Sequence, residues 1–161
     1  MRKQKGFSLI ELLIVVAIIL IIAAIAIPNL LRARIAANES SAVASIRTVN
    51  TAMISYNSSY PTVGFASNLL TLGGTCTGTT VPTSTSACLI DSTLAAGTKS
   101  GYTFVATASG TAPVGSYYAY GNPITSNSTG VRSFCSVQDA VVRVTGTSST
   151  GGCAGTEPPL Q

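Results

Sequence analysis

The pattern of apolar and polar positions divides the chain at about residue 28. An apolar run begins at Phe7, and residues 12–27 include no polar side chain. At a rise of about 1.5 Å per residue, residues 7–27 make a helix of roughly 30 Å, the thickness of a bilayer's hydrocarbon core. Pro28 follows this run and predicts a bend or loosening just before it, because proline lacks an N–H and clashes with the preceding turn.

A second pattern follows at residues 29–60, where apolar positions recur on one helical face. Their spacing of four, three, four, three and four residues is that of a single stripe. The stripe consists of Ala42, Ile46, Val49, Met53, Tyr56 and Tyr60. We therefore expect the helix to run on to Pro61, with a first half that is apolar all round and a second half whose stripe is covered by the rest of the chain.

After Gly101 the pattern is typical of strands. Short runs rich in aromatic and β-branched residues are separated by Gly, Pro, Asn and Ser, which form turns. The expected strands are 102–107, 115–120, 130–135 and 141–145. Short consecutive strands predict an antiparallel meander. The expected fold is α+β, a long N-terminal helix packed on a small antiparallel sheet of about four strands, in which the strand aromatics are mostly core.

Between helix and sheet, residues 61–100 read as a long connection with a threonine-rich centre at 75–86. A short helical turn is expected at 92–96, with Ser92 as its cap. The tail 151–161 contains two prolines and is expected to be irregular and held by Cys153. The organisation expected for the chain is therefore 1–6, 7–28, 29–60, 61–100 and 101–161.

One carboxylate interrupts the apolar run. Glu11 lies near its start, where a charge in a membrane costs about 2.5–3.5 kcal/mol on insertion scales. Arg2, Lys3 and Lys5 precede it, and nothing else in the first thirty residues is expected to neutralise it. Without residues 1–6 the chain holds six Lys/Arg against five Asp/Glu, so its bulk charge does not support binding to nucleic acid.

The chain contains no histidine, and its five acids are scattered. It therefore lacks the commonest general base and the commonest metal ligand, and we expect neither an enzyme nor a cofactor. Four cysteines, Cys76, Cys88, Cys135 and Cys153, lie beyond the apolar run. They allow three disulfide connectivities or free thiols. Cys76–Cys88 with Cys135–Cys153 is favoured, because both bonds close short, turn-rich loops.

The N-terminal residues resemble those of type IV prepilins: a basic leader ending in Gly6, then Phe7, then Glu11 and Pro28 in an apolar helix. The resemblance implies that prepilin peptidase cuts between Gly6 and Phe7 and methylates the new Phe7 amine. It implies a helical homopolymer, built by inner-membrane pilus machinery. The precursor would be a single-pass inner-membrane protein, and the product an extracellular pilus.

Cleavage would also explain the acid, because the Phe7 nitrogen becomes cationic only afterwards. The ammonium of a neighbouring copy then has Glu11 as its partner, and Pro28 lies in the same assembling helix. Two other readings of the apolar run stay open. An ordinary secretory signal would use the A-x-A-like site at 24–26, and a simple anchor would span the membrane without processing. Two rival functions also remain: a pseudopilin of a type II secretion system and a monomeric membrane-anchored binding protein.

Overall fold

The structure is a computed structural model that describes residues 7–74, 76, 79, 81–108, 110–145, 153 and 155–160. The expected leader, residues 1–6, lies outside the described residues. The internal contacts divide the chain into one unit of residues 1–34 and another of residues 35–161. Each unit is described by itself.

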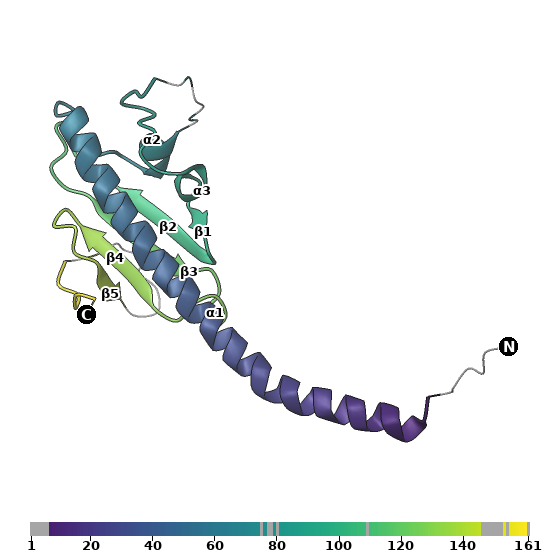
Figure 1. Cartoon of the computed structure of the whole chain (residues 1–161). Helices are drawn as coiled ribbons and strands as arrows, with labels where there is room; N and C mark the ends of the chain where they lie inside the picture. Colours follow the sequence, from purple (N-terminus) through teal and green to yellow (C-terminus); the bar gives the residue numbers. More distant parts are fainter. Residues whose placement is uncertain are drawn as a thin grey trace. The chain divides into compact units, whose positions relative to one another are not determined.

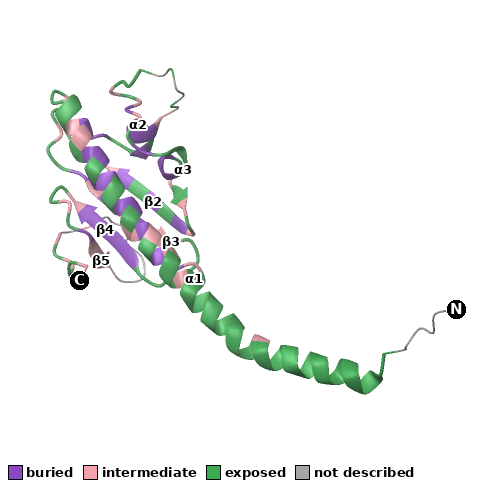
Figure 2. Cartoon of the chain, viewed as in Figure 1, coloured by how far each residue is buried: buried purple, intermediate pink, exposed green. Residues whose placement is uncertain are grey.

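A single helix, α1 (Leu9–Ser59), belongs to both units and is unbroken at Pro28 (Figure 1). It confirms the prediction of one long helix, to within two residues at either end. Among the described residues it is the one helix long and apolar enough to cross a membrane, judged by length and composition. Its first half, Leu9–Arg34, leaves nearly every side chain exposed, whereas its second half buries a stripe (Figure 2).

The sheet has five antiparallel strands in sequence order, so the predicted meander is confirmed. The strands are β1 (Thr98–Lys99), β2 (Tyr102–Thr107), β3 (Tyr118–Pro123), β4 (Ser133–Val137) and β5 (Arg143–Thr145). The expectation of about four strands missed β1, a two-residue strand that pairs with β2. Its turn needs positive φ at Ser100 and Gly101, and serine is not a residue that signals such a conformation.

Two strands, β3 and β4, begin three residues later than predicted, and α1 contacts the segment that precedes each of them. Val131 and Arg132 donate their backbone N–H groups to Glu39 Oε1, both at 3.0 Å, so β4 starts only at Ser133. Before β3, Tyr117 donates its hydroxyl to Asn50 Oδ1 of α1 at 3.0 Å. Neither contact has a signal in the local sequence.

The core lies between the α1 stripe and one face of the sheet. Ala42, Ile46, Val49, Met53 and Tyr56 are each at most 1% exposed. The sheet contributes Tyr102, Phe104, Ala106, Ala119 and Phe134 to the same cluster. Burial of each large side chain contributes roughly 1.5–3 kcal/mol. The predicted stripe is thus confirmed, with its last member, Tyr60, only partly buried.

Not every strand aromatic is core. Tyr118 and Tyr120 are half-buried and stack with ring centroids 6.3 Å apart. Successive strand residues point to opposite faces. Ala119 between them is in the core, so both rings lie on the sheet face that α1 does not cover.

The connection at 61–100 contains two short helices, of which only the second was predicted. The missed helix is α2 (Leu69–Gly73), where Asn68 Oδ1 accepts the Thr71 N–H at 2.8 Å as an N-cap. In α3 (Ser92–Ala95) the cap is Asp91, which accepts the Leu94 N–H, and not Ser92 as expected.

Two disulfides have the connectivity favoured from the loop lengths. Cys76–Cys88 holds the threonine-rich segment, and Cys135–Cys153 ties the tail to β4, with Cα–Cα distances of 5.7 and 5.5 Å. The tail also pairs with β5: Val144 donates its N–H to Pro158 O, and Leu160 donates to Val142 O. The end of the chain, expected to be irregular, therefore covers the outer edge of the sheet.

Glu39 joins α1 to the start of β4. Its side chain is 9% exposed, and Oε2 lies 2.7 Å from an Arg132 guanidinium nitrogen. Burial raises the pKa of Glu39. The backbone N–H donors of Val131 and Arg132 and the guanidinium of Arg132 lower it by more than burial raises it, so the pKa lies below its ordinary value. Glu39 therefore stabilises the fold as an anion.

We predict that Glu39→Gln lowers the unfolding free energy by about 1–2 kcal/mol at pH 7, because charge-assisted hydrogen bonds are replaced by weaker ones. A carboxylate with a lowered folded pKa stabilises above its unfolded pKa, about 4.3, and loses this contribution as the pH falls through the folded value. The difference between variant and wild type should therefore shrink below about pH 4.

Urea unfolding of the full chain in detergent, followed by tyrosine fluorescence at pH 7 and pH 3, measures this difference. The matched control is Ser40→Ala, the neighbouring exposed position on α1, which should unfold like wild type. Equal stability of Glu39→Gln and wild type at pH 7 would contradict the assigned role.

Candidate assembly site at the start of the helix

Glu11 caps the first turn of α1 with its side chain. Leu12 donates its N–H to Ser8 O at 3.2 Å, which makes Ser8 the residue that precedes the helix. The N–H of Ser8 donates in turn to Glu11 Oε2 at 2.9 Å. This is one half of a capping box, in which the third helical residue reaches back to the N-cap. The carboxylate also lies at the positive end of the helix dipole, where negative charge is favourable.

This contact gives Glu11 a hydrogen-bond donor that the sequence analysis did not name. The sequence signal was present, since Ser8-Leu9-Ile10-Glu11 has the S-x-x-E spacing of a capping box. The partner is a neutral N–H, however, and within the described part of the chain Glu11 has no ion pair. A hydrogen bond of this kind orders the turn without neutralising the charge.

Around Glu11 the helix surface is almost wholly apolar. One face carries a shallow groove with the i, i+3, i+4, i+7 spacing of a single helical side. It is lined by Leu9, Leu12, Leu13, Val16, Ala17 and Leu20. The large apolar side chains from Phe7 to Leu31 are between 44% and 79% exposed. A patch of this extent far exceeds what monomeric soluble proteins leave in water, so lipid or other protein chains must cover it.

The predicted site residues fall into two groups. Phe7 and Glu11 lie in the first unit, Phe7 two residues before α1 and Glu11 in its first turn, and Phe7 is 75% exposed. Gly6, on the other side of the expected cleavage point, lies outside the described residues. Pro28 is inside α1, and the cysteines are all in the second unit.

One cluster of possible metal ligands includes two cysteines that form a disulfide. Cys135, Cys153 and Glu157 place their ligand atoms within 4.8 Å of one another. The two sulfurs are joined in a disulfide, and metal binding requires the thiolate form. This cluster does not supply a metal site in the oxidised protein.

Comparison with known proteins identifies the N-terminal region. Residues 1–27 match the family described as the prokaryotic N-terminal methylation motif. The chain carries this motif. The motif contains the groove, Glu11 and the junction between Gly6 and Phe7.

Three curated relatives match parts of the chain. The chain is 68% identical over 40 residues to the type IV wide pilus major component PilA4 of Thermus thermophilus, covering 25% of this chain and 30% of the relative. It is 43% identical over 65 residues to the type II secretion system core protein G of Vibrio cholerae, covering 38% and 44%. It is 46% identical over 54 residues to the type IV major pilin protein PilA of Myxococcus xanthus, covering 34% and 24%.

The chain thus spans less than half the length of these curated relatives. No solved structure matches it significantly. The fold itself, a long apolar helix packed on an antiparallel sheet, is consistent with the pilin fold that the motif implies.

We predict that Glu11→Ala loosens the first turn, whereas Glu11→Gln does not, because glutamine keeps an acceptor for the Ser8 N–H. Loss of a cap costs roughly 1 kcal/mol, so the Ser8 amide should exchange about five- to tenfold faster in Glu11→Ala. Hydrogen exchange of the chain in detergent micelles, resolved at residues 8–12, measures this. Val16→Ala, in the helix interior, serves as control and should leave the Ser8 amide unchanged. Equal exchange in Glu11→Ala and wild type would contradict the cap.

Proposed function

We propose that this chain is the precursor of a structural, non-enzymatic subunit of a type IV pilus, which polymerises through residues 7–28 after residues 1–6 are removed. The observation that carries the proposal is the exposed apolar helix with one unneutralised carboxylate in its first turn, inside a methylation motif. Attachment, twitching motility and DNA uptake are the roles that such a filament supports.

Cleavage between Gly6 and Phe7 supplies the missing cation. The Phe7 nitrogen changes from an uncharged amide to an α-amine with a pKa of about 7.7–8.0, and methylation preserves its charge. The intrachain partner of Glu11 is a neutral N–H, which supplies no counter-charge. The Phe7 ammonium of an adjacent copy pairs with Glu11, and the pair sets the axial register between helices. Removing one member of such a buried pair costs about 3–5 kcal/mol.

The apolar surface supplies the remaining interface. A helix that is apolar on all sides is stable both in lipid and among copies of itself, so the subunit has a place in the inner membrane and a place in the filament core. Contacts between unlike surfaces of successive copies do not close, and they generate an open helical assembly. The partners of this process are prepilin peptidase and the inner-membrane assembly machinery, which supplies the work of extraction.

A pseudopilin of a type II secretion system is the second candidate, supported by the similarity to core protein G. It shares the processing and the helix, and differs in building a short assembly that stays in the cell envelope. A monomeric membrane-anchored binding protein would have neither processing at Gly6 nor an assembly.

We predict that material sheared from cells contains this chain, beginning with N-methylated Phe7 followed by Ser-Leu-Ile-Glu. Mass spectrometry of the sheared fraction and of the membrane fraction measures both the terminus and the location. The same terminus found only in membranes would favour the pseudopilin. A chain that begins at Met1 or Ile27 would contradict both candidates.

We predict that Glu11→Gln and Glu11→Ala both insert in the membrane normally and both reduce sheared filament at least tenfold, since each removes the charge. The comparison is informative because Glu11→Gln retains the acceptor for Ser8. Membrane fractionation controls for insertion, and Glu11→Asp retains the charge. Filaments of normal yield from Glu11→Gln would show that the cap, and not the ion pair, is what assembly requires.

A further inference from the structure

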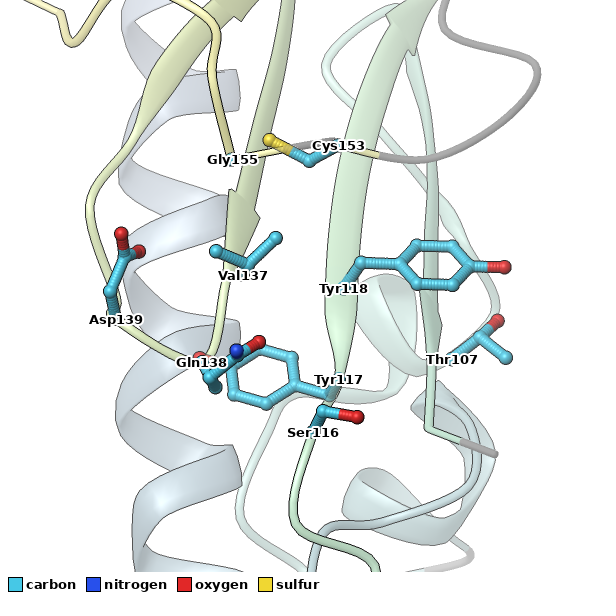
Figure 3. Close-up of a pocket in the computed structure, with 9 residues that line it drawn as sticks. All are labelled: Thr107, Ser116, Tyr117, Tyr118, Val137, Gln138, Asp139, Cys153 and Gly155. Carbon is cyan, nitrogen blue, oxygen red and sulfur yellow. The ribbon is translucent and has the colours of Figure 1, made fainter. Parts of the chain in front are cut away.

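A groove crosses the sheet face that α1 does not cover, next to the Cys135–Cys153 disulfide. It has a volume of about 440 Å³. Thr107, Tyr118 and Val137 form one rung across β2, β3 and β4, since Tyr118 pairs with both of the others. In Figure 3 the Tyr118 ring extends toward Thr107, Ser116 and Gln138 lie at one end of the groove, and Cys153 lies at the other.

The polar side chains of this groove are not used by the fold. Within the described part of the chain, Thr107, Ser116, Tyr118 and Gln138 have no side-chain hydrogen-bond partner. Together they offer three hydroxyls and one carboxamide, groups that donate and accept hydrogen bonds. Several convergent, uncommitted polar groups beside an apolar surface are typical of a small-molecule site.

The groove has no uncommitted charge among its described residues. Its one ionisable acid, Asp139, accepts from Arg143 Nη1 at 3.0 Å and from the Val141 N–H at 2.9 Å. Tyr117, which also lines the groove, has its hydroxyl engaged by Asn50. An ionic ligand would therefore find no free counter-charge among these residues, whereas a neutral ligand needs none.

An aromatic ring supplies the apolar surface. Tyr118 stacks against Tyr120 with an angle of 10° between the ring planes. Tyr120 does not line the groove, and Tyr117, which does, donates its hydroxyl to Asn50 of α1. Tyr118 is therefore the lining ring that faces away from α1, with Val137 beside it. A tyrosine in this setting combines an apolar face with a polar tip.

We propose that this groove binds a neutral oligosaccharide. A pyranose ring has C–H faces that stack on an aromatic ring and equatorial hydroxyls that donate and accept hydrogen bonds, which matches Tyr118 and the uncommitted groups around it. A proline-rich peptide also stacks on tyrosine, but it lacks donors for the three hydroxyl oxygens. The site lies wholly in the second unit, so it is independent of whether the chain polymerises.

The test uses the full chain in a detergent without a sugar headgroup, because a glycosidic detergent would compete for the groove. The probes are cellohexaose, chitohexaose and maltohexaose, with a hyaluronan hexasaccharide as the anionic comparison and a decaproline peptide as the peptide comparison. Tyrosine fluorescence and NMR shifts report binding. We expect saturable binding of at least one neutral hexasaccharide, about tenfold weakening in Tyr118→Ala and about threefold weakening in Gln138→Ala.

Matched variants separate the groove from general effects. Tyr118→Phe keeps the ring and removes one uncommitted hydroxyl, and should weaken binding severalfold. Tyr60→Phe makes the same change at the end of α1, away from the groove, and should bind like wild type. The proposal is overturned if no neutral hexasaccharide binds at 10 mM (on the order of the weakest specific affinities), if Tyr118→Ala binds like wild type, or if hyaluronan or decaproline binds more tightly than all three.

Discussion

One helix stripe supports most of this structure. The stripe positions Ala42, Ile46, Val49, Met53 and Tyr56 are each at most 1% exposed. Their burial against the sheet commits the second half of α1 to the folded unit. The same helix continues through Pro28, and its first half belongs to the other unit. A helix satisfies its own backbone hydrogen bonds, so that half is helical without a tertiary partner. Its apolar surface remains available for contact with lipid or with other helices.

Two buried polar side chains on α1 give the packing its register. Apolar contact is non-directional and would tolerate a shift of the helix along the sheet. Glu39 accepts two backbone N–H groups at the start of β4. About three turns further along α1, Asn50 forms hydrogen bonds with Ser136, Ala140 and Tyr117. A shifted helix would leave these groups buried without partners, which costs more than the bonds contribute.

The two glutamates of α1 show how the same residue type serves different ends. Glu39 accepts hydrogen bonds from two backbone N–H groups and pairs with a guanidinium, so its carboxylate serves the packing of the fold. Glu11 receives a neutral donor, the Ser8 N–H, from its own turn. Two neighbouring tyrosines show a similar contrast. Tyr117 donates its hydroxyl to Asn50 of α1, whereas Tyr118 faces away from α1 and leaves its hydroxyl without a described partner.

The sequence by itself determined what depends on local pattern. The long helix, its apolar half, its buried stripe, the meander and the N-terminal motif all follow from periodicity or from contiguous residues, and loop length favoured the disulfide pairing that is present. The capping box at Ser8 and Glu11 was equally local and was overlooked. What only the tertiary structure decided are the contacts that join distant segments: the late start of β4, the role of Glu39, and the groove around Tyr118. These depend on which backbone groups another element binds. Glu39 and Arg132 are some ninety residues apart in the sequence, so the residues around either one do not indicate that the two are in contact.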